Sequence, residues 1–409
     1  MRLPKRIAPL LLLVPLLSQA QRQAWTEEAV LQEFQNQNPI QRETRARQAI
    51  ASAETRSRTL WSNPSLGVSH EGAGRTEFYQ AFQSLPLSGR FSLIRQAGAL
   101  QGEVLNAEGA FSLWLARCAL RTAFFEAVAA QERRAVWTDA SRELAQVIAT
   151  LAEREREGEG SRLDRLRAER EQVELSASTR LIDADLAAAR GAMLAFLPSQ
   201  TPLAAFSGSL EAKAPTATLA DWIPKSLSNR LDIQAERRRL DQYRKEQQAA
   251  NRLRIPEPTV NAGLKRSNTS RQNGYNGIDN GPVIGISIPL PLFNQGKAEV
   301  ARFSAEQERS SARLEQLTRR VQASVEAAWQ TFAVQRDTRD AYIQSQDSST
   351  HELLRIATLA YQEGEIGILQ LLDAHRLRRE SRLRQIDLSL LAKQSQIALE
   401  AQIGEEFPR

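Results

Sequence analysis

Two stretches of this chain read as single helices that are much longer than those of globular proteins. Residues 91–157 and 297–362 keep an unbroken helical pattern of Ala, Leu, Glu, Gln and Arg. A helix of that length would extend on the order of 100 Å, whereas globular helices average about ten to fourteen residues. With only 6% aromatic residues among 409, the chain is expected to form long packed helices instead of large compact cores.

Each long helix ends at a glycine-containing turn and is followed by a return helix. The expected helical hairpins span 91–196 and 297–403. Glycine suits such tight reversals because they need a positive φ or a close contact. Ser161 is placed to cap the first return helix. The two turns contain Glu157, Gly158, Glu159 and Gly160, and then Tyr361, Glu363, Gly364, Glu365 and Gly367.

A change to period-two patterning precedes each long helix. Residues 64–87 and 256–290 predict two β-hairpins, the second with strands at 256–265 and 282–290 around a loop at 267–281. In the last strand Ile284, Ile286 and Ile288 alternate with small or polar residues, as in a transmembrane β-barrel. The edge of a sandwich packed on helices would also fit these strands. Hinges between strands and helices are expected at Pro86, Gly89, Pro289, Pro291 and Gly296.

The same order of elements occurs twice, which predicts a tandem repeat. Pro86 matches Pro289 at an offset of 203, and Gly158 matches Gly364 at an offset of 206. A slowly rising offset is what duplication with loop insertions produces. The chain is therefore divided into a first repeat at 21–197, a central connector at 198–228, a second repeat at 229–403 and a C-terminal tail at 404–409.

Residues 1–20 have the pattern of a secretory signal peptide. Arg2, Lys5 and Arg6 precede an apolar run at 7–17, and residues 18–20 form a small-x-small cleavage site. No other stretch approaches the ~18 apolar residues that a membrane helix needs. Four strands cannot close a membrane barrel, because the smallest have about eight, so a membrane position requires several copies of the chain.

Composition and residue spacing exclude several other classes of function. The net charge of +6 is dispersed along the helices, so a nucleic-acid partner is not expected. Cys118 is the single cysteine and is expected to be a buried structural thiol. His70, His351 and His375 lack the close spacing of a metal site. We therefore expect no catalytic residue, no metal site and no cofactor.

The order of elements and three local motifs resemble the TolC-type outer membrane efflux family. The motifs are Pro289-Leu-Pro-Leu-Phe-Asn-Gln-Gly296, Tyr361-Gln-Glu-Gly364 and Leu369-Gln-Leu-Leu-Asp-Ala374. The first motif is similar to that of the heavy-metal efflux branch. Over about residues 38–403 the resemblance implies a mainly α homotrimer, with one twelve-stranded β-barrel in the bacterial outer membrane and a helical barrel in the periplasm.

The same resemblance implies passive conduction by a protein that is not an enzyme. An inner-membrane pump would supply the energy, a periplasmic adaptor protein would dock on the helical tips, and outer membrane lipid would surround the barrel. Metal cations are the substrate class that the heavy-metal branch implies. A periplasmic adaptor and a structural coiled-coil protein of the envelope remain the alternative functions.

The resemblance places the two glycine turns at the periplasmic entrance of the conduit. The glutamates at 157, 159, 363 and 365 would form an acidic ring in a trimer, or would remain solvated turn residues. The residues that follow the turns would contact the adaptor or pack the hairpins. These residues are Leu163, Leu166, Leu369, Leu372, Asp373 and Ala374.

Overall fold

The computed structural model describes residues 24–36, 38–72, 76–198, 200–215, 217–269, 277–346 and 349–407. It is mainly helical and holds one small β-sheet. The chain divides into two compact units. The first unit comprises Met1–Asn36, Ala123–Leu210 and Gln346–Leu390, and the second comprises Gln37–Thr122, Glu211–Ser345 and Leu391–Arg409. The predicted signal peptide at 1–20 lies outside the described residues.

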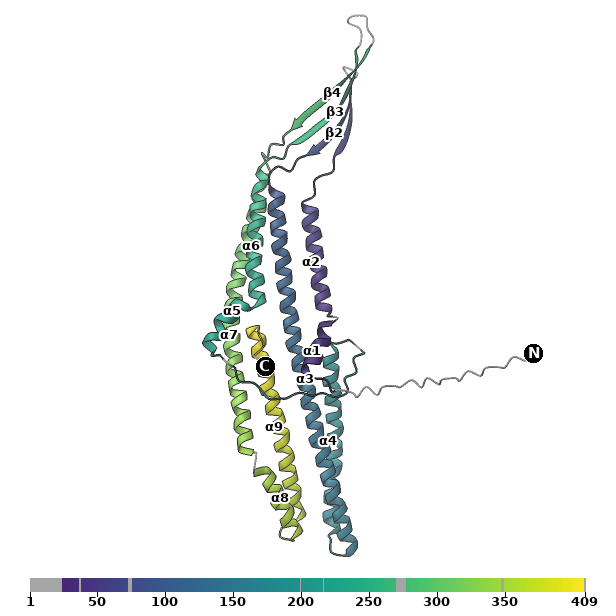
Figure 1. The fold of residues 1–409 in the computed structure, drawn as a ribbon, viewed down its shortest axis with the longest axis vertical. Helices are drawn as coiled ribbons and strands as arrows, with labels where there is room; N and C mark the ends of the chain where they lie inside the picture. The colour runs from purple at the N-terminus through teal and green to yellow at the C-terminus, as the bar shows by residue number, and fades with distance from the viewer. Residues whose placement is uncertain are drawn as a thin grey trace, which may run out of the picture. The chain divides into compact units, whose positions relative to one another are not determined.

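The first unit contains two helical hairpins (Figure 1). One consists of the C-terminal part of α3 (Arg90–Glu157) and α4 (Arg162–Leu194), and the other of α8 (Ser349–Gln362) and the N-terminal part of α9 (Ile368–Ile403). Part of their contact is apolar. Leu151 of α3, Leu175 of α4 and Leu371 of α9 are buried in one cluster, which holds the two hairpins together.

The predicted connector at 198–228 contributes a second core to the first unit. Trp25, just before α1 (Glu27–Asn36), forms a parallel bridge with Phe206. The rings of Phe124 and Phe206 meet edge to face with centroids 6.1 Å apart. Both side chains are buried, so this segment packs as part of the fold.

The second unit carries the other helices. They are α2 (Pro39–Arg58), the start of α3, α5 (Leu219–Asn229), α6 (Leu231–Asn251), a short 3-10 helix (Arg252–Arg254), α7 (Lys297–Gln346) and the end of α9. Trp222, Phe332 and Phe407 share one buried cluster. The described part of the predicted tail is therefore anchored in this core through Phe407, which is 5% exposed.

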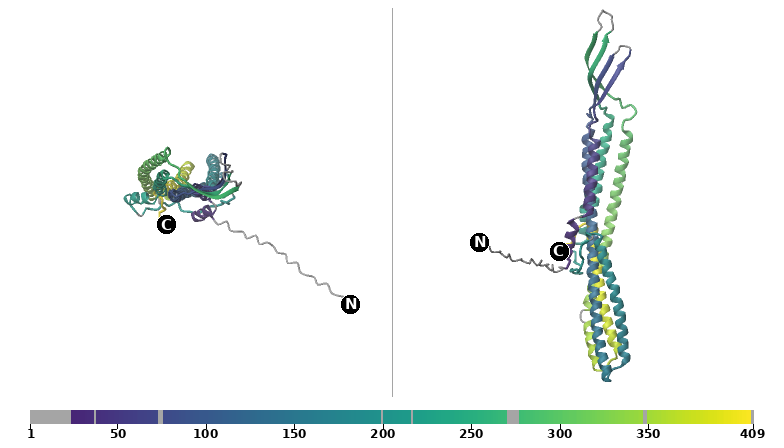
Figure 2. Two further views of the ribbon diagram at one scale, coloured as in Figure 1. Left: turned by 90° about the horizontal axis from the view of Figure 1, so that it is seen from above. Right: turned by 90° about the vertical axis from the view of Figure 1, so that its right-hand side faces the viewer.

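A four-stranded antiparallel sheet extends from the second unit (Figure 2). Its order is β1 (Ser65–Glu71), β2 (Thr76–Ser84), β3 (Thr259–Thr269) and β4 (Gly277–Ser287), so β1 and β4 are the edges. The predicted loop at 267–281 was too long, because polar and Gly residues at the hairpin end still pair. The predicted last strand at 282–290 ends at Ser287, since Pro289 has no N–H to donate.

Most helix bounds agree with the sequence analysis to within a few residues. The side chain of Asn38 accepts a hydrogen bond from the Ile40 amide at 2.9 Å, and Pro39 occupies the first turn of α2. The predicted helix at 297–362 is described as α7 and α8, and residues 347–348 lie outside the described part. None of the described helices is both long and apolar enough to cross a membrane.

Candidate functional site

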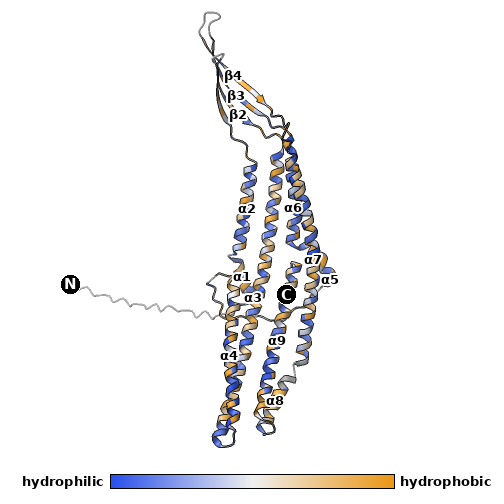
Figure 3. Cartoon of the chain, turned by 180° about the vertical axis from the view of Figure 1, so that it is seen from behind, coloured by the Kyte–Doolittle hydropathy of each residue, from blue (hydrophilic) through white to orange (hydrophobic). Residues whose placement is uncertain are grey.

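The sheet has one apolar face. Directly paired residues share a face, and the register pairs Val68 with Tyr79, Tyr79 with Leu264, and Ala262 with Ile284. These side chains are exposed, with Ile284 at 85%. In Figure 3 orange, hydrophobic stretches follow β4. The exposed face therefore has the hydropathy of a surface that contacts lipid.

The opposite face of the sheet carries mainly small and polar side chains, together with Phe78 and Phe82. Phe82 pairs with Ser65 and Asn261, and Asn261 pairs with Gly285. Side chains of the neighbouring strands fill the space above the glycines on this face. A Cβ at Gly67 would lie 2.8 Å from the Phe82 ring, and one at Gly285 would lie 2.6 Å from the Asn261 side-chain oxygen. The predicted alternation of β4 thus extends across all four strands.

The hinges after β2 and β4 share one backbone conformation. The Leu87 amide donates to the Leu85 carbonyl at 2.9 Å across Pro86, and the Leu292 amide donates to the Leu290 carbonyl at 2.9 Å across Pro291. Each hinge ends at a glycine with positive φ, Gly89 at 72° and Gly296 at 74°. The shared turn matches Pro86 with Pro291. The strand ends keep the predicted match of Pro86 with Pro289, because Ser84 and Ser287 both pair with Thr259.

The two turns at the hairpin ends are also alike. Gly158 has φ of 81° and Gly364 has φ of 80°. At each turn the glycine amide and the next amide bond back to the helix. Gly158 and Glu159 donate to the Glu155 and Arg154 carbonyls at 3.2 and 3.0 Å, and Gly364 and Glu365 donate to the Tyr361 and Ala360 carbonyls at 3.2 and 2.8 Å. Both turns are Schellman motifs, which confirms the predicted need for glycine at 158 and 364.

Other predicted turn residues act differently. A Cβ at Gly160 would lie 2.7 Å from the Glu155 backbone nitrogen, so this glycine is needed for close approach. Gly367 has only the flexible end of Gln370 nearby, at 3.2 Å. Ser161 stands at the N-cap of α4, but its side chain makes no capping hydrogen bond. The prediction of a Ser161 side-chain cap was wrong, because the N-cap position alone does not orient the hydroxyl toward a backbone amide.

The turns bring acidic and basic residues together. Glu157, Glu159, Glu363 and Glu365 are all exposed. Tyr361 is half-buried beside them, with the Arg154 guanidinium 5.9 Å from its ring centroid. Burial, followed by the nearby charge of Asp164, raises the pKa of the Tyr361 hydroxyl. Tyr361 therefore links the second turn to the hairpin of α3 and α4.

The residues after the turns separate into exposed and buried sets. Leu163, Leu166 and Leu369 are exposed, as is Asp373, whereas Ala374 is buried. Leu372 packs against the hairpin core, but the residues that form it are Leu371 and its neighbours. Leu166, Leu369 and Asp373 line an open groove of about 720 Å³. Sequence spacing could not separate the two sets because both fall on the same helical turns.

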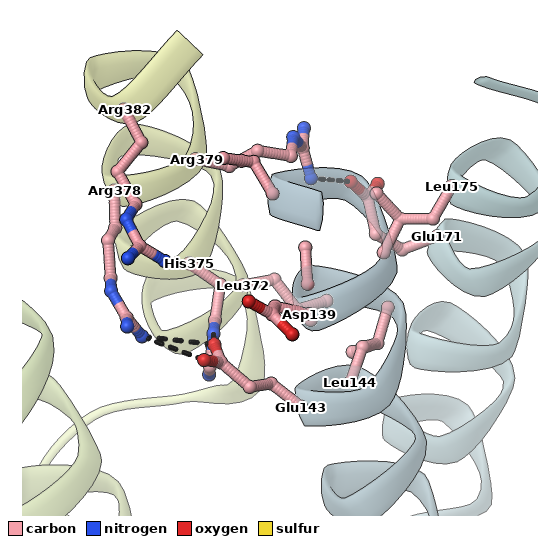
Figure 4. A pocket seen from close by; sticks show the side chains of 12 residues that line it. Asp139, Glu143, Leu144, Glu171, Leu175, Leu372, His375, Arg378, Arg379 and Arg382 are labelled. Atoms are coloured by element: carbon pink, nitrogen blue, oxygen red, sulfur yellow. Dashed lines mark hydrogen bonds and ion pairs between the residues drawn. The ribbon is translucent and has the colours of Figure 1, made fainter. Parts of the chain in front are cut away.

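A cavity of about 30 Å³, lined by charged and apolar side chains of α3, α4 and α9, was not foreseen (Figure 4). The Arg378 guanidinium bonds both Glu143 carboxylate oxygens at 3.0 and 3.1 Å, and His375 Nδ1 lies 3.6 Å from Glu143. Burial lowers the pKa of His375, Glu143 raises it, and Arg378 lowers it further. Across the cavity, the Arg379 guanidinium lies 4.8 Å from the Trp137 ring centroid. Charged contacts therefore join the two hairpins.

Cys118 lies in α3 and is buried, as predicted. Burial raises the pKa of its thiol to about 12. Among the residues that the structure describes, no three His, Cys, Asp or Glu side chains are grouped closely enough to hold a metal ion.

Comparisons with known proteins find similar sequences and folds. Residues 222–405 match the sequence profile of the family described as outer membrane efflux protein. Over 264 residues the chain is 26% identical to the cobalt-zinc-cadmium resistance protein CzcC of Cupriavidus metallidurans, and this match covers 64% of the chain and 61% of CzcC. The chain therefore matches less than two thirds of that curated relative.

Solved structures show the same fold. The outer membrane channel CmeC of Campylobacter jejuni superposes with a TM-score of 0.72 at 12% identity, covering 93% of this chain and 86% of CmeC. A structure of CusC, reported for transmembrane channel formation, gives 0.71 at 18% identity over 93% and 92% of the two chains. Over its residues 222–405 the chain is similar to the outer membrane efflux protein family.

Proposed function

We propose that this chain is the outer membrane channel of a tripartite efflux system and works as a homotrimer. The observation that carries this proposal is the two-faced sheet with both of its edge strands open in the described chain. In lipid, unpaired N–H and C=O groups at such an edge cost several kcal/mol each. Pairing β4 of one copy with β1 of the next removes these edges. Three copies give twelve strands, which exceeds the minimum of about eight.

Paired backbone features support the tandem repeat, in which residues 21–197 and 229–403 are equivalent. Both hinges contain the same proline turn, and both hairpin ends contain the same Schellman motif. Each repeat contributes one β-hairpin and one helical hairpin. In a trimer these units would be arranged around one axis, so the helices would form a periplasmic barrel below the strands.

The hairpin ends would form the entrance of this conduit and the docking site for a periplasmic adaptor. Exposed Leu166 and Leu369 line a groove that also contains charged side chains, an arrangement suited to the tip of another helical hairpin. An inner-membrane pump would supply the energy. The channel then conducts substrate passively to the exterior, and Gly158 and Gly364 fix the turns that the adaptor contacts.

Metal cations are the substrate class that we propose. CzcC is a cobalt-zinc-cadmium resistance protein, and the match covers much of the chain at 26% identity. The exposed Glu157, Glu159, Glu363 and Glu365 would provide an acidic entrance, which favours cations over anions.

Reconstitution tests the channel directly. The mature protein is expected to fractionate with outer membranes, to crosslink as a trimer and to produce single-channel currents in planar bilayers. A soluble monomer would favour a periplasmic adaptor. A membrane-free oligomer without currents would favour a structural coiled-coil protein of the envelope.

A further inference from the structure

The register of the sheet is not fixed by packing against helices. Among the described elements, no helix covers either face of the sheet (Figures 1 and 2). A slip of one residue would exchange the two faces, but a slip of two residues would keep every side chain on its present face. Hydropathy alone therefore allows a slip of two residues. Glycines in β1, β3 and β4 weaken the specification of register further.

On the polar face, Phe82 of β2 lies across the edge strand β1. It pairs directly with Ser65, and its ring reaches diagonally over Gly67, where an added Cβ would lie 2.8 Å from the ring. Ser65, Ser69 and Glu71 share this face, so within the described strand Gly67 is the one position on it without a Cβ. A slip of two residues in either direction would bring the ring over Ser65 or Ser69, whose Cβ atoms would occupy its place.

The other edge strand has a similar contact. Asn261 of β3 pairs directly with Gly285 of β4, and a Cβ at Gly285 would lie 2.6 Å from the Asn261 side-chain oxygen and 3.2 Å from its nitrogen. A slip of two residues would place Val283 or Ser287 there. We call these two contacts, Phe82 with Gly67 and Asn261 with Gly285, the register locks. One lies at each edge of the sheet, and both are on the polar face.

We propose that Phe82 and Asn261 are positioning residues, which hold β1 and β4 in the register that lets them pair with a second copy of this chain. The inference rests on the proposed function, because only a closed barrel needs both edges in register. A slip of two residues would move an edge strand by about 7 Å, since each residue of a strand rises about 3.4 Å. The N–H and C=O groups at the seam would then lack partners at one end, which is costly in lipid.

The locks are at the strands that need them most. β2 and β3 each have two neighbours in the sheet, whereas β1 and β4 have one each within the chain. β1 is also the shortest of the four described strands, with seven residues. One aromatic cross-strand contact changes an equilibrium by up to roughly fivefold, which is a large share of what can fix the register of such a strand.

Disulfide trapping measures the register of β1. In full-length protein with Cys118→Ala, the pair Leu66→Cys and Ala81→Cys reports the observed register, because these residues are direct partners. Ala81→Cys with Val68→Cys reports a slip of two residues in one direction, and Leu66→Cys with Tyr79→Cys reports a slip in the other. Paired strand residues lie within the Cα distance that a disulfide spans. The four positions are on the apolar face, away from the locks.

We expect the protein with both locks intact to form the in-register disulfide almost exclusively. Phe82→Ala is expected to raise the yield of the slipped disulfides by up to roughly fivefold, whereas Phe82→Tyr, which keeps the ring, should not raise it. Phe78→Ala is the matched control, because Phe78 is on the same face of β2 but does not lie over Gly67. Melting of the helices, followed by circular dichroism, should be the same in all of these proteins. Equal yields with and without Phe82→Ala would overturn the proposal.

Assembly tests the consequence for pairing between copies. Gly67→Ala and Gly285→Ala place a Cβ against a lock, whereas Gly281→Ala adds one to the same face of β4 with no atom within 4 Å. Trimer formation in phospholipid vesicles is followed by chemical crosslinking over time. It is expected to be severalfold slower for the first two variants and for Phe82→Ala, and unchanged for Gly281→Ala.

The outcomes separate the locks from the proposed function. Slipped disulfides together with wild-type assembly rates would show that the locks do not serve pairing between copies, which would overturn the proposal. Equal slowing in Gly281→Ala would show a general cost of side chains on this face and would overturn it as well. A wild type that stays monomeric would contradict the homotrimer and the pairing role together, whereas the disulfide yields report the register of β1 even then.

Discussion

At the scale of single residues, the turn glycines have a conformational role that can be measured. A side chain in the left-handed region costs roughly 1–2 kcal/mol, and Gly364 has φ of 80° with no atom near its missing Cβ. We therefore predict that Gly364→Ala accelerates amide hydrogen exchange in the turn by roughly tenfold. Gly364→Asn should be intermediate, because Asn tolerates this region. Gly191→Ala is the control, since it adds a Cβ in open space within α4.

His375 predicts a pH dependence of the contact between the hairpins. Its pKa is lowered from the usual 6.5, mainly by burial, so the packed state favours neutral imidazole. Unpacked states bind more protons below pH 6.5, and stability must fall as pH drops from there through the lowered pKa. We predict that the melting temperature falls more between pH 7.5 and 5.5 for the wild type than for His375→Gln. Equal decreases in both proteins would contradict this prediction.

The sequence predicted the roles of residues that depend only on the adjacent backbone. Gly158 and Gly364 end helices, and this role depends on a few adjacent positions. It did not predict the contact of Glu143 with His375, because residues 143 and 375 meet only through packing of the two hairpins. The Ser161 side chain shows the same limit, since it occupies the expected position without making the expected bond.

At the scale of elements, helices were predicted better than strands. The helical period and the glycine turns define α3 and α9 almost completely, and the resulting bounds differ little from the prediction. Strand bounds depend on pairing partners. Asp279 and Asn280 are in β4 because they face Ser267 and Arg266, although their composition is that of a loop. The sequence predicted which side chains of β4 share a face, but it did not predict the length of the strand.

The seam between α2 and α3 contains two glycines that their sequence context did not explain. A Cβ at Gly98 would lie 2.2 Å from the Thr55 hydroxyl, and one at Gly109 would lie 2.2 Å from the Thr44 hydroxyl. Each threonine donates to the carbonyl four residues earlier, which fixes its rotamer. The two glycines are eleven residues apart, and so are the two threonines. Eleven residues are close to three full turns of a straight helix, so both contacts fall on the same helix faces.

We predict that Gly98→Ala destabilises this seam by about 1–3 kcal/mol through overpacking, which exceeds the gain of roughly 1 kcal/mol in helix propensity. Gly102→Ala is the control, because no atom lies within 4 Å of its Cβ position. The midpoint of chemical unfolding should fall for Gly98→Ala and should be unchanged or higher for Gly102→Ala. Thr55→Ala combined with Gly98→Ala should recover part of the loss, because it removes the two nearest atoms and leaves the Thr55 Cβ at 2.8 Å.

At the scale of the whole molecule, a homotrimer would multiply the charges of the hairpin ends. Each chain has exposed Glu157, Glu159, Glu363 and Glu365 at its two turns. Threefold symmetry would bring twelve carboxylates to the proposed entrance, where partial exclusion of water strengthens their field. We predict that replacing all four glutamates by Gln lowers the cation-to-anion permeability ratio, measured from the reversal potential in a salt gradient.

A general change in net charge must be separated from a local effect at the entrance. E43Q/E54Q/E299Q/E308Q removes the same charge from exposed positions on α2 and α7 in the second unit. Its permeability ratio should stay near that of the wild type, because exposed charges are screened beyond about 10 Å at 0.1 M salt. Equal shifts in the two variants would assign selectivity to the whole channel. No shift in either would leave the turn glutamates as solvated residues, with arginines such as Arg154 offsetting their field.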